Sequence, residues 1–196
     1  IVQSVAANPV VWIVLLIVLL MAVIVGAIGA VIGSGGAANS AEDYTYQAQV
    51  SEQTESYRDM VEDYCEKYGI DDYVDLCLAV IEQESGGNPP DVMQTEQSYY
   101  NVNPPIDTVE ESIDCGTHEL SDCLTKAKSK SPNDIKGISL ALQGYNFGSG
   151  YIDWALKNYG CYSKENAEIF SKKMCVELGY DSYGDVEYVP HVLRYY

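Results

Sequence analysis

One glutamate stands at the end of an apolar helical stripe, where a carboxyl group can act as an acid. Glu84 follows Cys77, Val80 and Ile81 by seven, four and three residues, so these residues share one face of a predicted helix. Burial on that face disfavours the carboxylate and raises the pKa of Glu84. A carboxyl group that keeps its proton near neutral pH can protonate a departing glycosidic oxygen. A helix-terminal glutamate without a chemical role has the same pattern, whereas Glu82, two residues earlier, is expected to face solvent.

A second carboxyl group follows seven residues later, in the segment NPPDVMQ. Two prolines precede Asp91 and stiffen the loop, which can hold Asp91 across a cleft from Glu84. Glycoside hydrolysis uses such a pair: one group donates the proton, and the other activates water or stabilises an oxocarbenium ion. The spacing in sequence leaves the distance between the two groups, and hence the stereochemistry, open.

Tyr145 and Asn146 form a third candidate group, in the segment ALQGYNFGSGYIDW. They end a predicted helix and precede two glycines, so they are expected at the mouth of a loop. Their polar groups can bond sugar hydroxyls and N-acetyl groups, and the 17 Tyr of the chain offer faces on which sugars stack. For Tyr145 the alternative is an ordinary core aromatic residue.

Short helices and long loops are expected to position these residues. Apolar residues recur at helical spacing in seven segments, and no run shows the alternation of a strand. Asp71 or Asp72 is expected to cap the second helix, which ends at Gly86, and residues 88–118 hold most of the Pro and Asn and are predicted as loop. The predicted helices are 54–69, 72–85, 119–130, 134–145, 151–159, 164–178 and 189–196.

The first 41 residues carry no charged side chain. Residues 10–32 are 23 consecutive residues without a polar side chain, enough for a helix of about 35 Å that crosses a bilayer. A cleaved signal peptide is the alternative. The sequence therefore predicts a transmembrane helix within residues 1–33, a linker at 34–53 and a mainly α domain at 54–196. Gly29 and Gly33 form a GxxxG motif that can pack two such helices.

The composition limits the partners and the chemistry. With 29 Asp and Glu against 11 Lys and Arg, the net charge is −18, which argues against a nucleic-acid partner. Only two His are present, and no zinc, phosphate-loop or hydrolase-elbow motif, so neither a metal nor a cofactor is expected. Six Cys indicate an oxidising compartment outside the cell and three disulfides, of which the sequence-local pairings are Cys65–Cys77, Cys115–Cys123 and Cys161–Cys175.

Three segments together resemble a known family. QESGGNPPDVMQTEQS, ALQGYNFGSGYIDWA and YVPHVLRYY occur in the order found in the lysozyme-like domain of CwlT-type cell-wall hydrolases, which accompany Gram-positive conjugative elements. These are relatives of goose-type lysozymes and soluble lytic transglycosylases, and the resemblance covers about residues 54–196. It implies that Glu84 is the catalytic acid and Asp91 the second catalytic carboxylate. It also implies a glycan site formed by Gln94, Ser98, Tyr145 and Asn146.

The resemblance implies a muramidase that cleaves peptidoglycan between N-acetylmuramic acid and N-acetylglucosamine. Such an enzyme would be held by its N-terminal helix at the cell membrane, with the domain facing the wall, and would open the wall locally during conjugation or secretion, beside that machinery. The alternatives are a lytic transglycosylase, a non-catalytic wall-binding assembly subunit, and a membrane scaffold that oligomerises through Gly29 and Gly33. Two features depart from the family: the six Cys, and the lack of the cysteine endopeptidase domain that usually follows.

Overall fold

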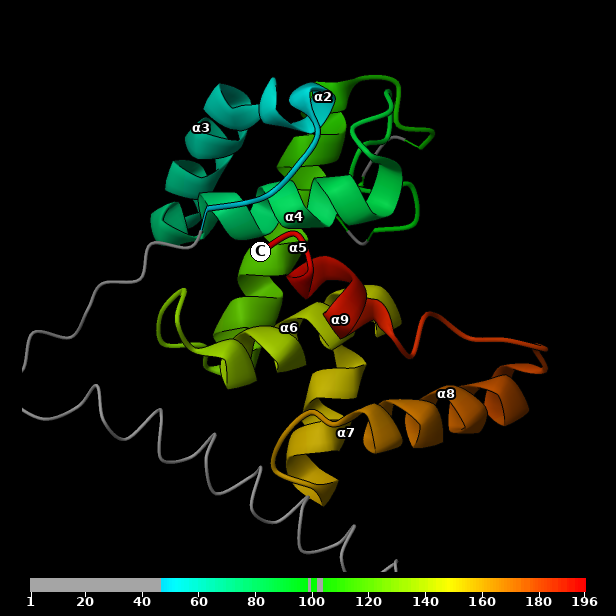
Figure 1. The fold of residues 1–196 in the computed structure, drawn as a ribbon. Helices are drawn as coiled ribbons and strands as arrows, with labels where there is room; N and C mark the ends of the chain where they lie inside the picture. The colour runs from blue at the N-terminus through cyan, green and yellow to red at the C-terminus, as the bar shows by residue number, and fades with distance from the viewer. Residues whose placement is uncertain (1–46, 99, 102–103) are drawn as a thin grey trace, which may run out of the picture. The chain divides into compact units, whose positions relative to one another are not determined.

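The computed structural model describes residues 47–98, 100–101 and 104–196 (Figure 1). The chain divides into two units, residues 1–43 and 44–196, and every described residue belongs to the second. The predicted membrane segment, residues 10–32, lies outside the described residues. In the part of the chain that is described, no helix combines the length and the apolar character needed to cross a bilayer.

Helices and loops make up the described residues, which contain no β-strand. The expectation of a mainly α domain with short helices is confirmed. The helices are α2 (Glu52–Glu55), α3 (Arg58–Tyr68), the 3₁₀ turn η2 (Asp71–Tyr73), α4 (Val74–Ser85), α5 (Val109–Ala127), α6 (Ile135–Phe147), α7 (Gly150–Asn158), α8 (Lys164–Leu178) and α9 (Tyr188–Leu193).

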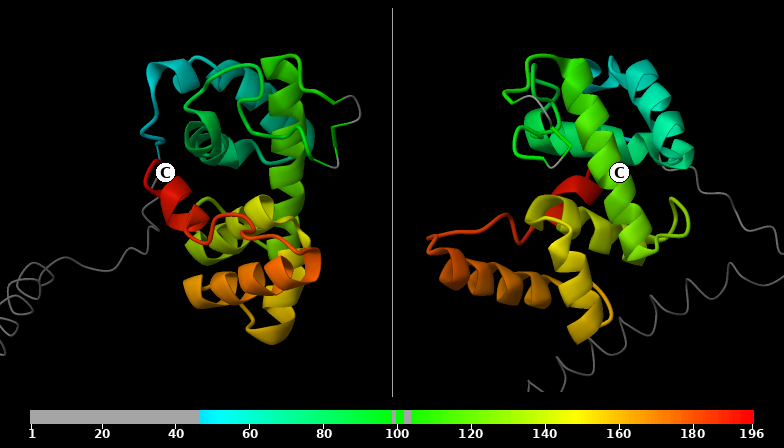
Figure 2. Two further views of the ribbon diagram at one scale, coloured as in Figure 1. Left: turned by 90° about the vertical axis from the view of Figure 1, so that its right-hand side faces the viewer. Right: turned by 180° about the vertical axis from the view of Figure 1, so that it is seen from behind.

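Helix α5 connects the first helices of the domain with the later ones. It packs against α3 on one side and against α6 and α7 on the other, and Figure 2 shows it running through the domain from top to bottom. Helix α9 lies between α4 and α6 and contacts both (Figure 1). Because α9 comes from the end of the chain, this arrangement brings residues about a hundred positions apart to the same place.

Helix α4 is buried through its middle, and it ends where the sequence predicts. Leu76 to Ile81 are six consecutive residues with no exposed surface. Gly86 ends the helix in the left-handed conformation, with φ +62°, which glycine adopts without steric cost. The predicted cap was wrong: Tyr73 precedes the helix without a side-chain bond, because Asp71 and Asp72 are taken up by the 3₁₀ turn.

Helix α5 begins ten residues earlier than predicted. Thr108 accepts a hydrogen bond from the backbone N–H of Glu111, and the Glu111 side chain accepts one from the backbone N–H of Thr108. This reciprocal arrangement is a capping box, and it satisfies two N–H groups that a helix start leaves unpaired. The last ten residues of the predicted loop, 109–118, are therefore helical.

The sequence predicts that Glu82 faces solvent, but its side chain is half-buried and hydrogen-bonded. Its carboxylate accepts hydrogen bonds from the Ser51 backbone at 3.2 Å, the Ser51 hydroxyl at 2.8 Å and the Thr54 hydroxyl at 2.5 Å. Burial raises the pKa of Glu82, but these bonds outweigh it and lower the pKa below its ordinary value. Since Ser51 also caps α2, Glu82 ties the first described residues of the domain to α4.

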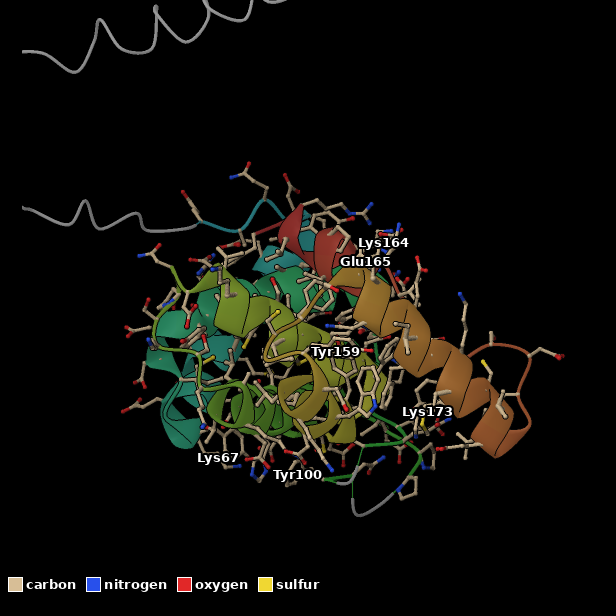
Figure 3. All side chains as sticks on the ribbon, turned by 90° about the horizontal axis from the view of Figure 1, so that it is seen from below. Lys67, Tyr100, Tyr159, Lys164, Glu165 and Lys173 are labelled. Atoms are coloured by element: carbon tan, nitrogen blue, oxygen red, sulfur yellow. The ribbon has the colours of Figure 1, made fainter. Side chains whose placement is uncertain are left out.

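An aromatic cluster holds α8 to the body of the domain. The ring of Phe170, on α8, lies 5.7 Å from Phe147, 5.2 Å from Tyr151 and 5.1 Å from Trp154. Figure 3 shows α8 from below, with Lys164 at its start and Lys173 further along. The contact at Phe170 fixes the position from which the chain returns toward α9.

None of the three predicted disulfides is present: all six Cys are free thiols. Cys115 and Cys123 lie on one helix eight residues, or about 12 Å, apart, beyond the reach of a disulfide. Cys161 precedes α8 while Cys175 lies near its other end, so this pair is also too far apart. The two sulfur atoms of Cys65 and Cys77 are neighbours, at 3.5 Å, without a covalent bond.

We expect the six thiols to react in the order of their exposure. Cys161 is exposed and should react first, whereas the buried Cys65, Cys77 and Cys123 should react only after unfolding. Burial also raises the pKa of Cys123 to about 12, which removes the reactive thiolate. Alkylation without reductant followed by mass spectrometry should label six thiols in the denatured chain and Cys161 first in the native chain; four labels in the denatured chain would contradict this.

Candidate active site

A cavity of about 460 Å³ opens where the loop after α4 meets α5, the end of α6 and the loop before α9. Its volume falls in the range of small-ligand sites. Five of the six site residues predicted from sequence line it. The lining residues are Asp91, Gln94, Glu96, Gln97, Ser98, Glu119, Tyr145, Asn146, Phe147, Gly148, Tyr183 and Gly184.

Glu84, the sixth predicted residue, lies beside this cavity on the last turn of α4. Burial raises the pKa of its carboxyl group to about 7. A hydrogen bond from Tyr188 lowers the pKa, and the charges of Asp91 and Asp185 raise it. Glu84 is not itself a lining residue, but its hydrogen-bond partner Tyr188 stacks at 6.5 Å on Tyr145, which lines the cavity. This carboxyl group can therefore hold a proton near neutral pH at the border of the cavity.

The hydrogen-bond partner of Glu84 comes from the other end of the chain. The Tyr188 hydroxyl donates to Glu84 Oε1 at 2.5 Å, across 104 residues. Tyr188 lies on α9 and is 2 % exposed, so packing fixes its ring and the direction of its hydroxyl. Burial raises its own pKa well above the ordinary value, which keeps the donor proton in place. The sequence pattern of α9 did not single out Tyr188, because nothing in that pattern points to Glu84.

Asp91 organises the loop that it begins. Its Oδ1 accepts hydrogen bonds from the Thr95 backbone at 2.8 Å, the Thr95 hydroxyl at 3.1 Å and the Ser112 hydroxyl at 2.7 Å. Its Oδ2 accepts one from the Glu96 backbone at 2.9 Å. Three donors saturate Oδ1, whereas Oδ2 retains a lone pair. Asp91 thus closes the loop and attaches it to α5, and only Oδ2 can accept a further bond.

Met93 attaches the same loop to the domain at a second point. Its backbone N–H donates to the Ser112 hydroxyl at 2.9 Å, and its carbonyl accepts from the Tyr145 hydroxyl at 3.0 Å. The side chain packs so closely on α5 that a Cβ at Gly116 would lie 2.5 Å from the Met93 sulfur. Gly116 is therefore required for the loop to approach α5 as it does.

Tyr145 and Asn146 each have a structural bond and a surface on the cavity. Tyr145 is half-buried; burial, and then the charges of Glu84 and Glu119, raise its pKa well above the ordinary value. Asn146 Oδ1 accepts a hydrogen bond from the Asp185 backbone at 2.7 Å, which holds the loop before α9 against α6. Tyr145 is thus both an aromatic residue packed against the core and a residue that lines the cavity.

Gln94 and Ser98 lie on the loop side of the cavity. Gln94 is exposed, with the left-handed φ of +53° that few residues other than glycine adopt, and its side-chain N–H donates to the Asp91 carbonyl at 2.8 Å. The Ser98 hydroxyl lies near the carboxyl group of Glu119 and lowers its pKa. Five of the predicted residues thus line one cavity, three from the loop after α4 and two from α6, and Glu84 is joined to it through Tyr188.

Glu119 lines the cavity but was not singled out from sequence. It lies on α5 two turns after Ser112, on the face that meets the loop. Burial raises its pKa, the Ser98 hydroxyl lowers it, and the charge of Asp122 raises it. The helix start had been predicted at Glu119, so its place in the middle of α5 was hidden; the capping box at Thr108 was the pattern that could have revealed it.

A family model described as lysozyme-like matches residues 51–196. Over 146 residues, 74 % of this chain, the sequence is 37 % identical to 42 % of the bifunctional muramidase/DL-endopeptidase CwlT of Bacillus subtilis. Over 117 residues, 60 % of this chain, it is 33 % identical to 57 % of a pneumococcal vaccine antigen A homolog of Streptococcus pyogenes. The chain thus spans about half the length of the curated relatives that it matches.

A solved structure has the same fold. A Staphylococcus aureus protein described as similar to a lipoprotein of the NLP/P60 family superposes with a TM-score of 0.64 and 31 % identity. The match covers 75 % of this chain and 53 % of that one.

Replacing Tyr188 by Phe is expected to raise the pKa of Glu84 above about 7, because the hydroxyl bond that lowers this pKa is lost while the burial that raises it remains. A ¹³C NMR titration of the Glu84 carboxyl group measures the change. Tyr195→Phe, two residues beyond α9, is the control and should leave the pKa of Glu84 unchanged. A lower or unaltered value in Tyr188→Phe would show that the hydroxyl does not act on Glu84.

Proposed function

Because the chain belongs to the lysozyme-like family, we propose that residues 54–196 are a peptidoglycan hydrolase. We place the cleaved bond between N-acetylmuramic acid and N-acetylglucosamine, as in a muramidase. The observation that carries the proposal is the setting of Glu84, a carboxyl group of raised pKa that is hydrogen-bonded to Tyr188, whose ring stacks on Tyr145 in the wall of the cavity. This is the arrangement that general-acid cleavage of a glycosidic bond requires.

In the proposed reaction Glu84 gives its proton to the oxygen that links the two sugars. The bond from the anomeric carbon to that oxygen breaks, and positive charge develops on the sugar ring. The carboxylate left on Glu84 is stabilised by the Tyr188 hydroxyl. A water bound to the free lone pair of Asp91 Oδ2 then attacks the anomeric carbon, and its proton returns to the medium or to Glu84.

A lytic transglycosylase is the second candidate, and one observation favours it. Asp91 already accepts four hydrogen bonds that fix its loop, which leaves little capacity to activate water. In a transglycosylase Glu84 acts first as acid and then as base. The 6-hydroxyl of the muramyl residue attacks the anomeric carbon, and a 1,6-anhydro sugar is the product.

Mass spectrometry of digested wall separates the two reactions. A muramidase adds water, so every new muramyl end is a reducing sugar. A transglycosylase leaves ends that are lighter by one water. We expect reducing ends; anhydro ends would instead assign the transglycosylase reaction to Glu84 and leave Asp91 as a loop-positioning residue.

The setting of the domain is also a proposal. Residues 10–32 would hold the protein at the cell membrane with the domain outside, facing the wall. One relative, from Bacillus subtilis and 28 % identical over 63 % of this chain, is described as a membrane protein. Local opening of the wall for a conjugation or secretion machine would be consistent with an anchored enzyme, since the anchor limits how far it acts.

Glu84→Gln is expected to lower the rate of wall cleavage by about 100-fold or more, because Gln cannot donate the proton. It should also stabilise the fold at pH 8. The folded-state pKa of Glu84, about 7, lies above the ordinary 4.5, so the stability that the bound proton gives is complete below pH 4.5 and lost as the pH rises through 7. The loss is roughly 3 kcal/mol, and Gln does not suffer it.

Turbidity of wall suspensions and thermal melts at pH 4 and pH 8 measure the two effects. Glu66→Gln, an exposed change of the same kind on α3, is the matched control and should alter neither. Undiminished cleavage by Glu84→Gln would contradict the assignment. A folded wild-type chain that binds wall and never cleaves it would favour the non-catalytic wall-binding subunit.

A further inference from the structure

Two carboxyl groups line the cavity without a part in the proposed reaction, the exposed Glu96 and the half-buried Glu119. Glu119 lines the same cavity as Asp91 and Tyr145. Unlike Asp91, whose carboxylate accepts four hydrogen bonds, Glu119 has one nearby hydroxyl group, that of Ser98. A carboxylate has room for about four acceptor bonds, so Glu119 keeps acceptor capacity toward the cavity.

Tyr145 relates Glu119 to the catalytic acid. Tyr145 and Glu119 both line the cavity, and the Tyr145 ring stacks at 6.5 Å on the ring of Tyr188, which is hydrogen-bonded to Glu84. Glu119 is thus part of the cavity wall, and Glu84 is joined to the same cavity through Tyr188 and Tyr145.

The electrostatic surroundings of Glu119 indicate what it can bind. Among the described residues that line the cavity there are three carboxyl groups, of Asp91, Glu96 and Glu119, and no Lys or Arg. An ionised carboxylate only accepts hydrogen bonds, so the ligand must bring donors. The strongest is a charged N–H donor, because a cation also supplies the neutralising charge that the cavity lacks.

We propose that Glu119 is a specificity-determining residue of this cavity. Its carboxylate accepts hydrogen bonds from the nitrogen at the 2-position of a bound amino sugar, so the cavity favours strands whose amino groups are free. The inference rests on the proposed function, since it assumes that the ligand is a glycan of amino sugars. Glu119 lies on α5, two turns from the Ser112 that holds Asp91, so the helix sets the distance between the sugar contact and the loop of Asp91.

Two substitutions separate charge from hydrogen bonding. Glu119→Ala removes every acceptor and should raise KM about tenfold on both N-acetylated and chemically de-N-acetylated glycan strands. Glu119→Gln keeps one oxygen acceptor and loses the charge, so it should raise KM mainly on the de-N-acetylated strands. In both variants kcat and the melting temperature should stay close to those of the wild type.

Steady-state kinetics on the two strand preparations, with thermal melts, provide the test. Glu66→Gln is the control for net charge and should leave KM unchanged on both preparations. The proposal is overturned if KM is independent of residue 119, if Glu119→Gln acts equally on both strands, if Glu66→Gln has the same effect, or if the variants melt at markedly lower temperature.

Binding of the strands to the full chain carrying Glu84→Gln separates this inference from the function on which it rests. If strands are cleaved and neither KM nor binding depends on Glu119, the inference fails alone. If the wild type cleaves no strand while Glu119→Ala still weakens binding, the proposed function fails and the role of Glu119 stands.

Discussion

The burial of one carboxyl group is the constraint on which the site depends. Glu84 ends an apolar helix, and the surrounding protein opposes its ionisation strongly enough to raise its pKa to about 7. The Tyr188 hydroxyl limits this effect and fixes the direction of Oε1. The two influences act in opposite directions, so the acid is both protonated near neutrality and able to release its proton.

Hydrogen bonds attach the loop beside this acid to the helices of the domain. Asp91 closes it by accepting from its own backbone, and Ser112 on α5 bonds to both Asp91 and the Met93 backbone. A single helix thus positions the loop that forms one wall of the cavity and carries Glu119 on the same face. Such support explains how a wall made of loop residues can keep a fixed geometry.

The charge of the cavity and the oxidation state of the cysteines both correct simple expectations from composition. The negative charge of the chain is not confined to a solvated exterior, because carboxyl groups also line the site. The six Cys do not form a disulfide framework, since three are buried as small apolar side chains within a continuous core. A domain of this size buries enough apolar surface to fold without disulfides, whereas very small domains usually need them.

The sequence by itself determined the helices, because apolar spacing and glycine stops are local: α8 begins and ends where predicted, and α4 ends at the predicted glycine. It also indicated Glu84, since the eight residues from Cys77 to Glu84 are enough to show a carboxyl group on an apolar helical face. The capping box that starts α5 is also present in the sequence, at Thr108 and Glu111.

Tertiary structure alone decided the partners of the site residues. These partners come from distant segments: Tyr188 contacts Glu84, Ser112 contacts Asp91, and Glu119 lines the cavity. A side chain's period along its own helix says which face it occupies and nothing about what another helix places opposite.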